Sequence, residues 1–169
     1  MRLSSPKPST RTSPADYGRV IGNYSLWANT TIFWGIGTNL HRLPYNARNH
    51  EYYSEDAVLT AGQGTAYAAA AMEYGVIIAP KHLAFNDTEI NRTGVSVFMT
   101  EQQARENELR GTQGIVENAH VLGVMTAYNR VGHHAGQRPH RPDEEHPAQR
   151  MGLPRLIPRT SSRTPTMLC

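Results

Sequence analysis

The chain has 169 residues, 38% of them hydrophobic, with 17 basic and 14 acidic side chains, which is the size and composition of about one globular domain. Its single cysteine, Cys169, excludes an internal disulfide and a cysteine-based metal site. The chain has no apolar run of transmembrane length and no signal-peptide pattern, so we expect no membrane partner and a location that is cytoplasmic or unknown.

The net charge of +3 comes from the C-terminal part of the chain. Residues 1–132 hold 11 basic and 11 acidic side chains, whereas residues 133–169 hold six arginines, three acids and six of the 11 prolines. Such a tail buries little apolar surface, so we expect it to be disordered. It lacks the aromatic residues and reader motifs of a nucleic-acid binder, and its histidines lack regularly spaced partner ligands. We therefore expect no nucleic-acid partner, no metal and no cofactor.

The N-terminal residues 1–15 are rich in Ser, Pro and Thr and predict a disordered lead-in. Globular sequence follows over residues 16–132. Within it, the β-branched and aromatic run at residues 30–34 is closed by glycines and predicts a buried strand.

Four further elements follow in chain order. Ser54, ahead of two acids, predicts the start of a helix that continues through alanine-rich sequence to about residue 74. The apolar run 76–79 predicts a second strand. A capping-box spacing of Thr and Gln predicts a helix over 100–118, and the run 121–127 predicts a third strand. Strands that alternate with helices indicate an α/β fold with a parallel sheet.

Polar side chains follow each of the three predicted strands. In barrel-type α/β folds the carboxyl ends of the strands meet at one rim, which carries the functional groups. We therefore expect the three sets to converge. The sets are Arg42, Arg48, Asn49, His50 and Glu51; Lys81, His82, Asn86, Asp87, Glu89 and Arg92; and Tyr128, Asn129 and Arg130.

Each set also has a purely structural interpretation. Arg48 could form an ordinary ion pair with Glu51 on a solvated rim, and Arg92 could do so with an acid of its own loop. Tyr128 could be a packed aromatic residue. The His82 ring, directly after a buried strand, favours a functional site more strongly, because a loop that needed only solubility would not favour a titratable group there.

Three motifs resemble glycoside hydrolase family 3, the β-glucosidases and their relatives. The resemblance covers residues 16–132 and implies a partial (β/α)8 TIM-type barrel, the N-terminal domain of that family. It implies retaining hydrolysis of bonds at terminal non-reducing β-D-glucosyl residues, with a β-glucoside or oligosaccharide as substrate. The motifs are RLPYNARNHEYYSED at 42–56, PKHLAFNDTEINRTG at 80–94 and VMTAYNRVG at 124–132.

The resemblance also implies roles for individual residues. Arg48, Lys81, His82 and Tyr128 match the family positions that line the subsite for the terminal glucose. The family takes its nucleophilic Asp from a later barrel strand and its acid/base from a following domain, and neither residue is identifiable here. We therefore expect this chain to be inactive and poorly folded in isolation. The alternative function is a non-catalytic sugar-binding remnant.

The tail departs from the family. Back-translated and read in another frame, residues 142–154 admit a string similar to the next family helix, and residues 159–168 admit one similar to the strand that carries the nucleophile. We interpret residues 133–169 as an out-of-frame, disordered segment. Nothing in the sequence indicates an oligomeric state.

Overall fold

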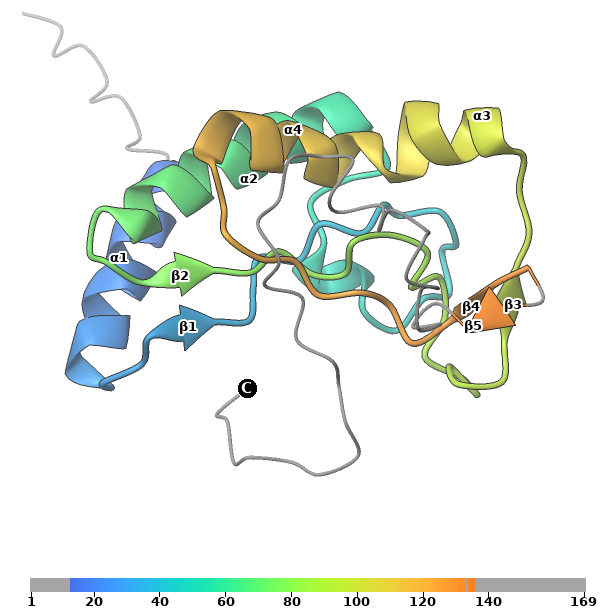
Figure 1. Ribbon diagram of the computed structural model, residues 1–169, viewed down its shortest axis with the longest axis horizontal. Coiled ribbons are helices and arrows are strands. Elements are labelled where there is room, and N and C mark those ends of the chain that lie inside the picture. The colour runs from blue at the N-terminus through green and yellow to red at the C-terminus, as the bar shows by residue number, and fades with distance from the viewer. Residues whose placement is uncertain (1–12, 133, 136–169) are drawn as a thin grey trace, which may run out of the picture.

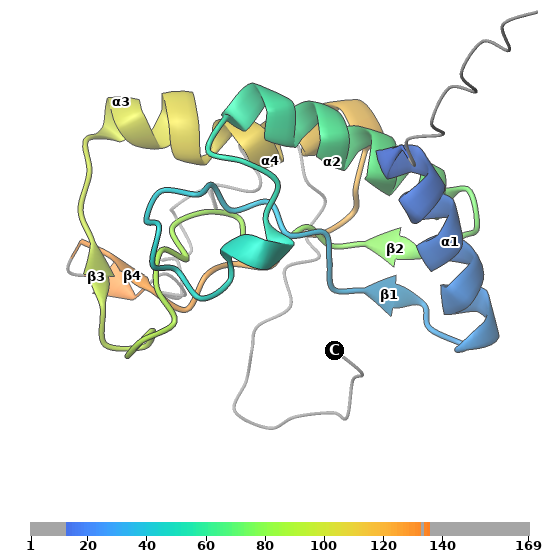
Figure 2. The same cartoon turned by 180° about the vertical axis from the view of Figure 1, so that it is seen from behind.

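The computed structural model describes residues 13–132, 134 and 135 of the chain. The helices of residues 57–72 and 101–119 lie along one side of the extended segments, and the helix of residues 14–27 runs past one end of them, as both views show (Figures 1 and 2). The elements are α1 (Pro14–Trp27), β1 (Ile32–Phe33), a 3-10 turn η1 (Asn49–Glu51), α2 (Ala57–Met72), β2 (Ile77–Ile78), β3 (Ser96–Val97), α3 (Glu101–Gln103), a π-helical segment η2 (Ala104–Glu108), α4 (Arg110–Ala119), β4 (Arg130–Val131) and β5 (His134–Ala135).

Parallel pairing joins segments that are far apart in the sequence. Strand β1 pairs with β2, with Ile32 opposite Ile77. Beyond the strand ends, Lys81 forms parallel bridges with Gly37 on one side and with Met125 on the other. The segments that contain β1, β2 and Met125 therefore lie side by side in chain order, which confirms the predicted α/β class with parallel pairing.

The predicted strand at 121–127 is wrong. This segment forms a single β-bridge, between Met125 and Lys81, and no continuous ladder. The Met125 amide donates to the Pro80 carbonyl at 2.9 Å, and the Leu83 amide donates to the Met125 carbonyl at 2.7 Å. Pro80 has no N–H with which to donate the next ladder bond toward the N-terminus. The segment is nevertheless held beside β2.

Helix α2 begins two residues after the expected position. Asp56 is its N-cap, and the carboxylate of Asp56 accepts from the Val58 amide at 2.6 Å and the Leu59 amide at 3.0 Å. Ser54 instead accepts from the Asp56 amide at 3.0 Å and supports the cap from outside the helix. An ionised cap at the positive end of the helix dipole explains why an aspartate takes this place.

The core lies between α2, α4 and the parallel segments. Its fully buried aliphatic side chains include Ile78, Ile115 and Val124. A Cβ at Gly64 of α2 would overlap the Ile115 side chain of α4, so glycine is required where the two helices approach. The predicted helix over 100–118 is present, although the structure divides it into α3, the π-helical segment and α4.

Helix α1 was not predicted. Ser13 and Asp16 form a reciprocal capping box at its N-terminus. Its buried face consists of Gly18, Gly22 and Ser25, and a Cβ at Gly18 would overlap a backbone carbonyl of α2. The predicted lead-in 1–15 therefore overlaps a helix by two residues.

The predicted tail also begins with a short ordered element. Strand β5 pairs antiparallel with β4, which in turn pairs parallel with β3. The rest of the predicted tail, and residues 1–12 of the predicted lead-in, lie outside the described residues. Among the described helices, none has the length and apolar character needed to cross a membrane.

Candidate functional site

The loops after β1, β2 and Met125 bring charged side chains together. Arg48 lies beside η1 and is hydrogen-bonded to Glu51. Lys81 follows β2, and its Nζ lies 3.7 Å from the second carboxylate oxygen of Glu51. Two cations from separate loops therefore share one carboxylate, and the Arg48 and Lys81 side chains are each only 19% exposed.

Glu89 extends the cluster of Arg48, Glu51 and Lys81 toward the loop after Met125, which carries Tyr128. Its carboxylate lies 3.4 Å from Nη1 of Arg48 and 2.9 Å from Nη1 of Arg92. The Arg92 guanidinium in turn lies 4.2 Å from the centroid of the Tyr128 ring, within cation–π distance. A continuous set of contacts therefore connects Arg48 to Tyr128.

Both glutamates of the cluster favour the ionised state. Burial opposes ionisation of Glu51, but the Arg48 hydrogen bond and the Lys81 charge outweigh it and lower the pKa of Glu51. Burial likewise opposes ionisation of Glu89, and the Asn86 hydrogen bond and the Arg48 charge lower the pKa of Glu89. These carboxylates are therefore counter-ions and hydrogen-bond acceptors rather than proton donors.

His82 is fully buried beside this cluster. Its Nδ1 lies 3.1 Å from the hydroxyl of Tyr52, and the Asn86 amide donates to the same hydroxyl at 3.3 Å. Burial, followed by the charges of Arg48 and Lys81, lowers the pKa of His82 to about 3, so the ring is neutral at neutral pH.

The Tyr52 hydroxyl can pair with either tautomer of His82. When the Tyr52 hydroxyl donates to Nδ1, the imidazole proton lies on Nε2, which has no hydrogen-bond partner in the part of the chain that the structure describes. In that tautomer the Nε2 proton is an unpaired donor on a fully buried ring.

Asn129 holds the loop that carries Glu89. Its side-chain oxygen accepts from the amides of Asp87 at 2.9 Å and Thr88 at 3.3 Å. Its side-chain nitrogen donates to the carbonyls of Thr88 at 3.1 Å and Arg92 at 2.9 Å. The residue after Tyr128 thus fixes the backbone of the neighbouring loop.

The structure brings the four predicted site residues, Arg48, Lys81, His82 and Tyr128, into this one region. The predicted pairing of Arg48 with Glu51 is present, and Arg92 pairs with Glu89 of its own loop. Sequence reasoning missed Tyr52, because no spacing or strand end marks it. The one feature of the sequence that could have pointed to Tyr52 is its position directly after Glu51, a residue of the first polar set.

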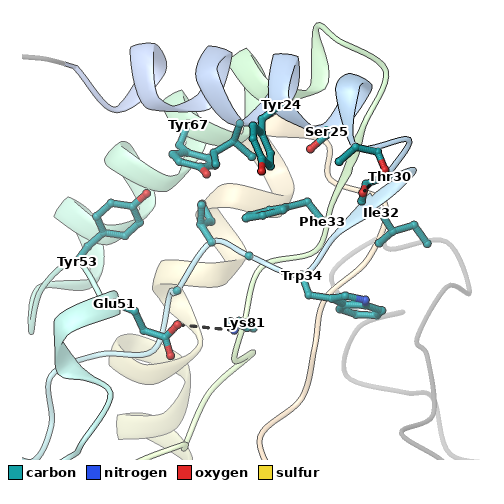
Figure 3. Close-up of a pocket in the computed structure, with 15 residues that line it drawn as sticks. Tyr24, Ser25, Thr30, Ile32, Phe33, Trp34, Glu51, Tyr53, Tyr67 and Lys81 are labelled. Atoms are coloured by element: carbon teal, nitrogen blue, oxygen red, sulfur yellow. Dashed lines mark hydrogen bonds and ion pairs between the residues drawn. The ribbon is translucent and has the colours of Figure 1, made fainter. Parts of the chain in front are cut away.

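An apolar cavity of about 450 Å³ borders the cluster. It lies between α1, β1 and α2, and Figure 3 shows the rings of Tyr24, Phe33 and Tyr67 around it, with the ion pair of Glu51 and Lys81 at one end. Across the described residues, no group of three or more His, Cys, Asp or Glu side chains is arranged to hold a metal ion.

Known proteins similar to this chain are β-glucosidases, although no family model matches it. A probable β-glucosidase J of Emericella nidulans is 34% identical over 123 residues, and the β-glucosidase BoGH3A of Bacteroides ovatus is 33% identical over 122 residues. β-Glucosidase 3B from Thermotoga neapolitana, solved in complex with glucose, superposes with a TM-score of 0.71 at 30% identity. The chain belongs to glycoside hydrolase family 3 and is β-glucosidase-like.

The family 3 match covers much of this chain but little of each relative. It spans 72% of the chain and 14% of the Emericella protein, 72% and 16% for the Bacteroides protein, and 73% and 17% for the Thermotoga structure. The chain thus corresponds to less than a fifth of the length of each.

Proposed function

We propose that this chain carries the sugar-binding part of a family 3 β-glucosidase site, in which Arg48, Lys81, His82 and Tyr128 bind the terminal glucose unit of a β-glucoside. The observation that carries the proposal is the shared contact of Arg48 and Lys81 with one glutamate, next to a buried, neutral His82. The similarity to β-glucosidases supports the same substrate class.

We further infer that residues 16–132 form part of a (β/α)8 TIM-type barrel. Three parallel segments lie in chain order with helices between them, which is the repeating unit of such a barrel. The charged side chains follow the carboxyl ends of these segments, where barrel enzymes carry their active sites.

The chemistry of these groups suits a sugar. The guanidinium and ammonium groups donate hydrogen bonds to vicinal hydroxyls, and His82 supplies a neutral donor when its proton lies on Nε2. Glu51 and Glu89 are ionised and hold these cations in place while offering acceptors. A sugar ring with several hydroxyls satisfies donors and acceptors of this kind together.

Retaining hydrolysis needs more than this cluster supplies. It requires two carboxyl groups about 5–5.5 Å apart, one as nucleophile and one protonated as acid. Glu51 and Glu89 are bound to cations and do not hold a proton at neutral pH. The 169-residue chain is therefore proposed to bind glucose without turnover, so that the non-catalytic sugar-binding alternative describes the isolated chain.

Calorimetric titration with glucose tests the binding claim. Replacing the ammonium of Lys81 in the variant Lys81→Met is expected to weaken glucose binding about tenfold or more, because charged hydrogen bonds contribute about 1.5–3 kcal/mol. The matched control is Arg105→Gln, which removes an exposed cation from the helical side. Equal affinity in Lys81→Met and the unmodified chain would overturn the proposal.

A hydrolysis assay separates binding from turnover. The purified chain is expected to bind glucose but to release no phenol from an aryl β-glucoside. Release that scales with protein concentration would contradict the absence of turnover, while the titration would still report on the binding residues.

A further inference from the structure

Tyr52 lies at the centre of a buried set of hydrogen bonds. Its side chain meets the His82 ring edge-on, with the ring centroids 6.4 Å apart and the planes at 84°. Its hydroxyl lies 3.1 Å from Nδ1 of His82 and 3.3 Å from Nδ2 of Asn86. All three residues are buried, so any polar atom of this set that lacks a hydrogen bond costs free energy.

The carboxylate of Glu89 fixes the orientation of the Asn86 side chain. Oε1 of Glu89 accepts from Nδ2 of Asn86 at 2.8 Å, and an ionised carboxylate can only accept. The opposite orientation of the amide would place its oxygen against the carboxylate. Asn86 therefore turns its nitrogen toward Glu89, and the same nitrogen has a second proton, which it donates to the Tyr52 hydroxyl.

The Tyr52 hydroxyl then has one proton to donate and one acceptor in reach. Burial raises the pKa of Tyr52, so the hydroxyl keeps its proton. Its oxygen already accepts from Asn86, and Nδ1 of His82 is its other partner among the described residues. When the hydroxyl donates to Nδ1, the Nε2 proton is the one group of His82 and Tyr52 left without a partner there.

The other tautomer of His82 leaves more groups unpaired. With its proton on Nδ1, the ring would donate to an oxygen that already accepts from Asn86. The hydroxyl proton of Tyr52 and the lone pair of Nε2 would then both lack a partner in the described part of the chain. Two unpaired buried groups cost more than one, so the bonds favour the tautomer with the proton on Nε2.

We propose that Tyr52 is a positioning residue, which holds the His82 imidazole in the tautomer that carries its proton on Nε2. The bonds run from Glu89 through Asn86 and Tyr52 to His82, so two separate loops together set the state of the ring. The tautomer is a property of the folded chain by itself. Its use, as a neutral donor to a glucose hydroxyl, rests on the sugar-binding function proposed above.

Nitrogen-15 NMR of the histidine rings in the 169-residue chain tests the tautomer. Protonated and unprotonated ring nitrogens resonate in separate ranges, and the variant His82→Gln identifies the His82 signals by their loss. At pH 7 we expect an unprotonated Nδ1 and a protonated Nε2. Burial, followed by the charges of Arg48 and Lys81, lowers the pKa of His82 to about 3 and keeps the ring neutral there. A proton on Nδ1, or two tautomers in exchange, would overturn the proposal.

The variant Tyr52→Phe removes the hydroxyl and keeps the ring. Nδ1 then loses its partner, so each tautomer leaves one N–H and one lone pair unpaired, and a mixture of tautomers is expected. Tyr53→Phe is the matched control, because Tyr53 is the next residue and packs against the core outside this set of bonds. It should keep the single tautomer. An unchanged His82 spectrum in Tyr52→Phe would overturn the role of Tyr52.

A second variant decides the question if Tyr52→Phe fails to fold. Asn86→Ala removes the donor from the far side of the hydroxyl, so that the Tyr52 oxygen is free to accept from Nδ1. Both tautomers then leave equal numbers of groups unpaired, and a mixture is again expected. A single Nε2-protonated form in this variant would overturn the proposed set of bonds.

Glucose titration by calorimetry measures the consequence for binding. When only part of the His82 rings carry the proton on Nε2, the apparent affinity falls with that fraction, and Tyr52→Phe is expected to bind glucose about two- to fivefold more weakly. Tyr53→Phe should bind as the unmodified chain does. Equal affinities in Tyr52→Phe and the unmodified chain would overturn the positioning role. Failure of every protein to bind glucose would refute the proposed function, whereas the NMR result would still decide the tautomer.

Discussion

Two acids of one loop, Asp87 and Glu89, lie in opposite electrostatic surroundings. Glu89 faces a cluster in which two carboxylates meet three cations, and its pKa is lowered. Asp87 is 3% exposed and contacts one cation, Arg42, and its pKa is raised. Burial, followed by the charge of Asp87, also raises the pKa of Glu108, to about 7. Deeper burial and fewer cations in contact therefore separate Asp87 from Glu89.

The largest expected effect comes from removing the side chain that holds the backbone of this loop. Asn129 is fully buried and makes four hydrogen bonds to backbone groups of residues 87–92. Asn129→Ala leaves these groups unpaired and is expected to lower the free energy of unfolding by about 3–4 kcal/mol. Urea unfolding at pH 7 measures the change.

Asn118→Ala is the control for this substitution. Asn118 makes one side-chain hydrogen bond, to the Gly114 carbonyl, on an exposed helical position. A change below about 0.5 kcal/mol is expected there. Equal effects of the two substitutions would contradict the role given to Asn129.

A smaller effect, confined to the cation-rich side, is expected for Arg48→Ala. The substitution leaves Glu51 and Glu89 without their shared cation in a partly buried site. The free energy of unfolding is expected to fall by about 2 kcal/mol, and glucose binding is expected to be lost. Arg105→Ala breaks an exposed ion pair and should change stability by less than about 0.5 kcal/mol. A similar small change for Arg48→Ala would contradict the account.

The smallest expected effect concerns acid pH. Since the pKa of His82 is lowered to about 3 in the folded chain, the unfolded chain binds a proton near pH 6.5 that the folded chain does not. The contribution of His82 to stability is therefore lost as the pH falls, by about 1–2 kcal/mol between pH 7 and pH 5. This direction is opposite to that of Glu108.

Comparison with His82→Gln isolates this contribution. The variant cannot take up the proton, so it lacks the gain in stability that His82 gives the unmodified chain as the pH rises from 5 to 7. The opposing contribution of Glu108, whose pKa is raised to about 7, is common to both proteins and cancels from the comparison. His50→Gln, at an exposed position, should keep the pH dependence of the unmodified chain. A His82→Gln profile parallel to that of the unmodified chain would show that the ring is not held neutral by burial.

The sequence predicted those elements whose signal lies in apolar or capping residues. The strands at β1 and β2 and the helix that contains α2 were predicted from apolar runs and cap residues. Helix α1 was not predicted because its buried residues are Gly18, Gly22 and Ser25. These small residues do not produce the helical repeat of large apolar side chains that marks a helix in a sequence. The expected strand around Met125 is reduced to one bridge because its neighbour Pro80 lacks a donor.

The candidate site was predicted in position but not in its internal bonding. Polar residues after strands pointed to Arg48, Lys81, His82 and Tyr128, because strand ends converge. The bond between Tyr52 and His82 and the ion pair of Arg42 with Asp87 depend on how separate loops pack. No local pattern encodes such contacts, since the partners are 30 and 45 residues apart.

Residues from three loops are proposed to bind one glucose unit, and an NMR titration of the 169-residue chain with glucose tests this binding. Side-chain and amide shifts of Arg48, Lys81, His82 and Tyr128 are predicted to move together with one dissociation constant, while signals of α1 residues exposed away from the site stay in place. No shift at these four residues at saturating glucose, or shifts spread evenly over the chain, would contradict the account.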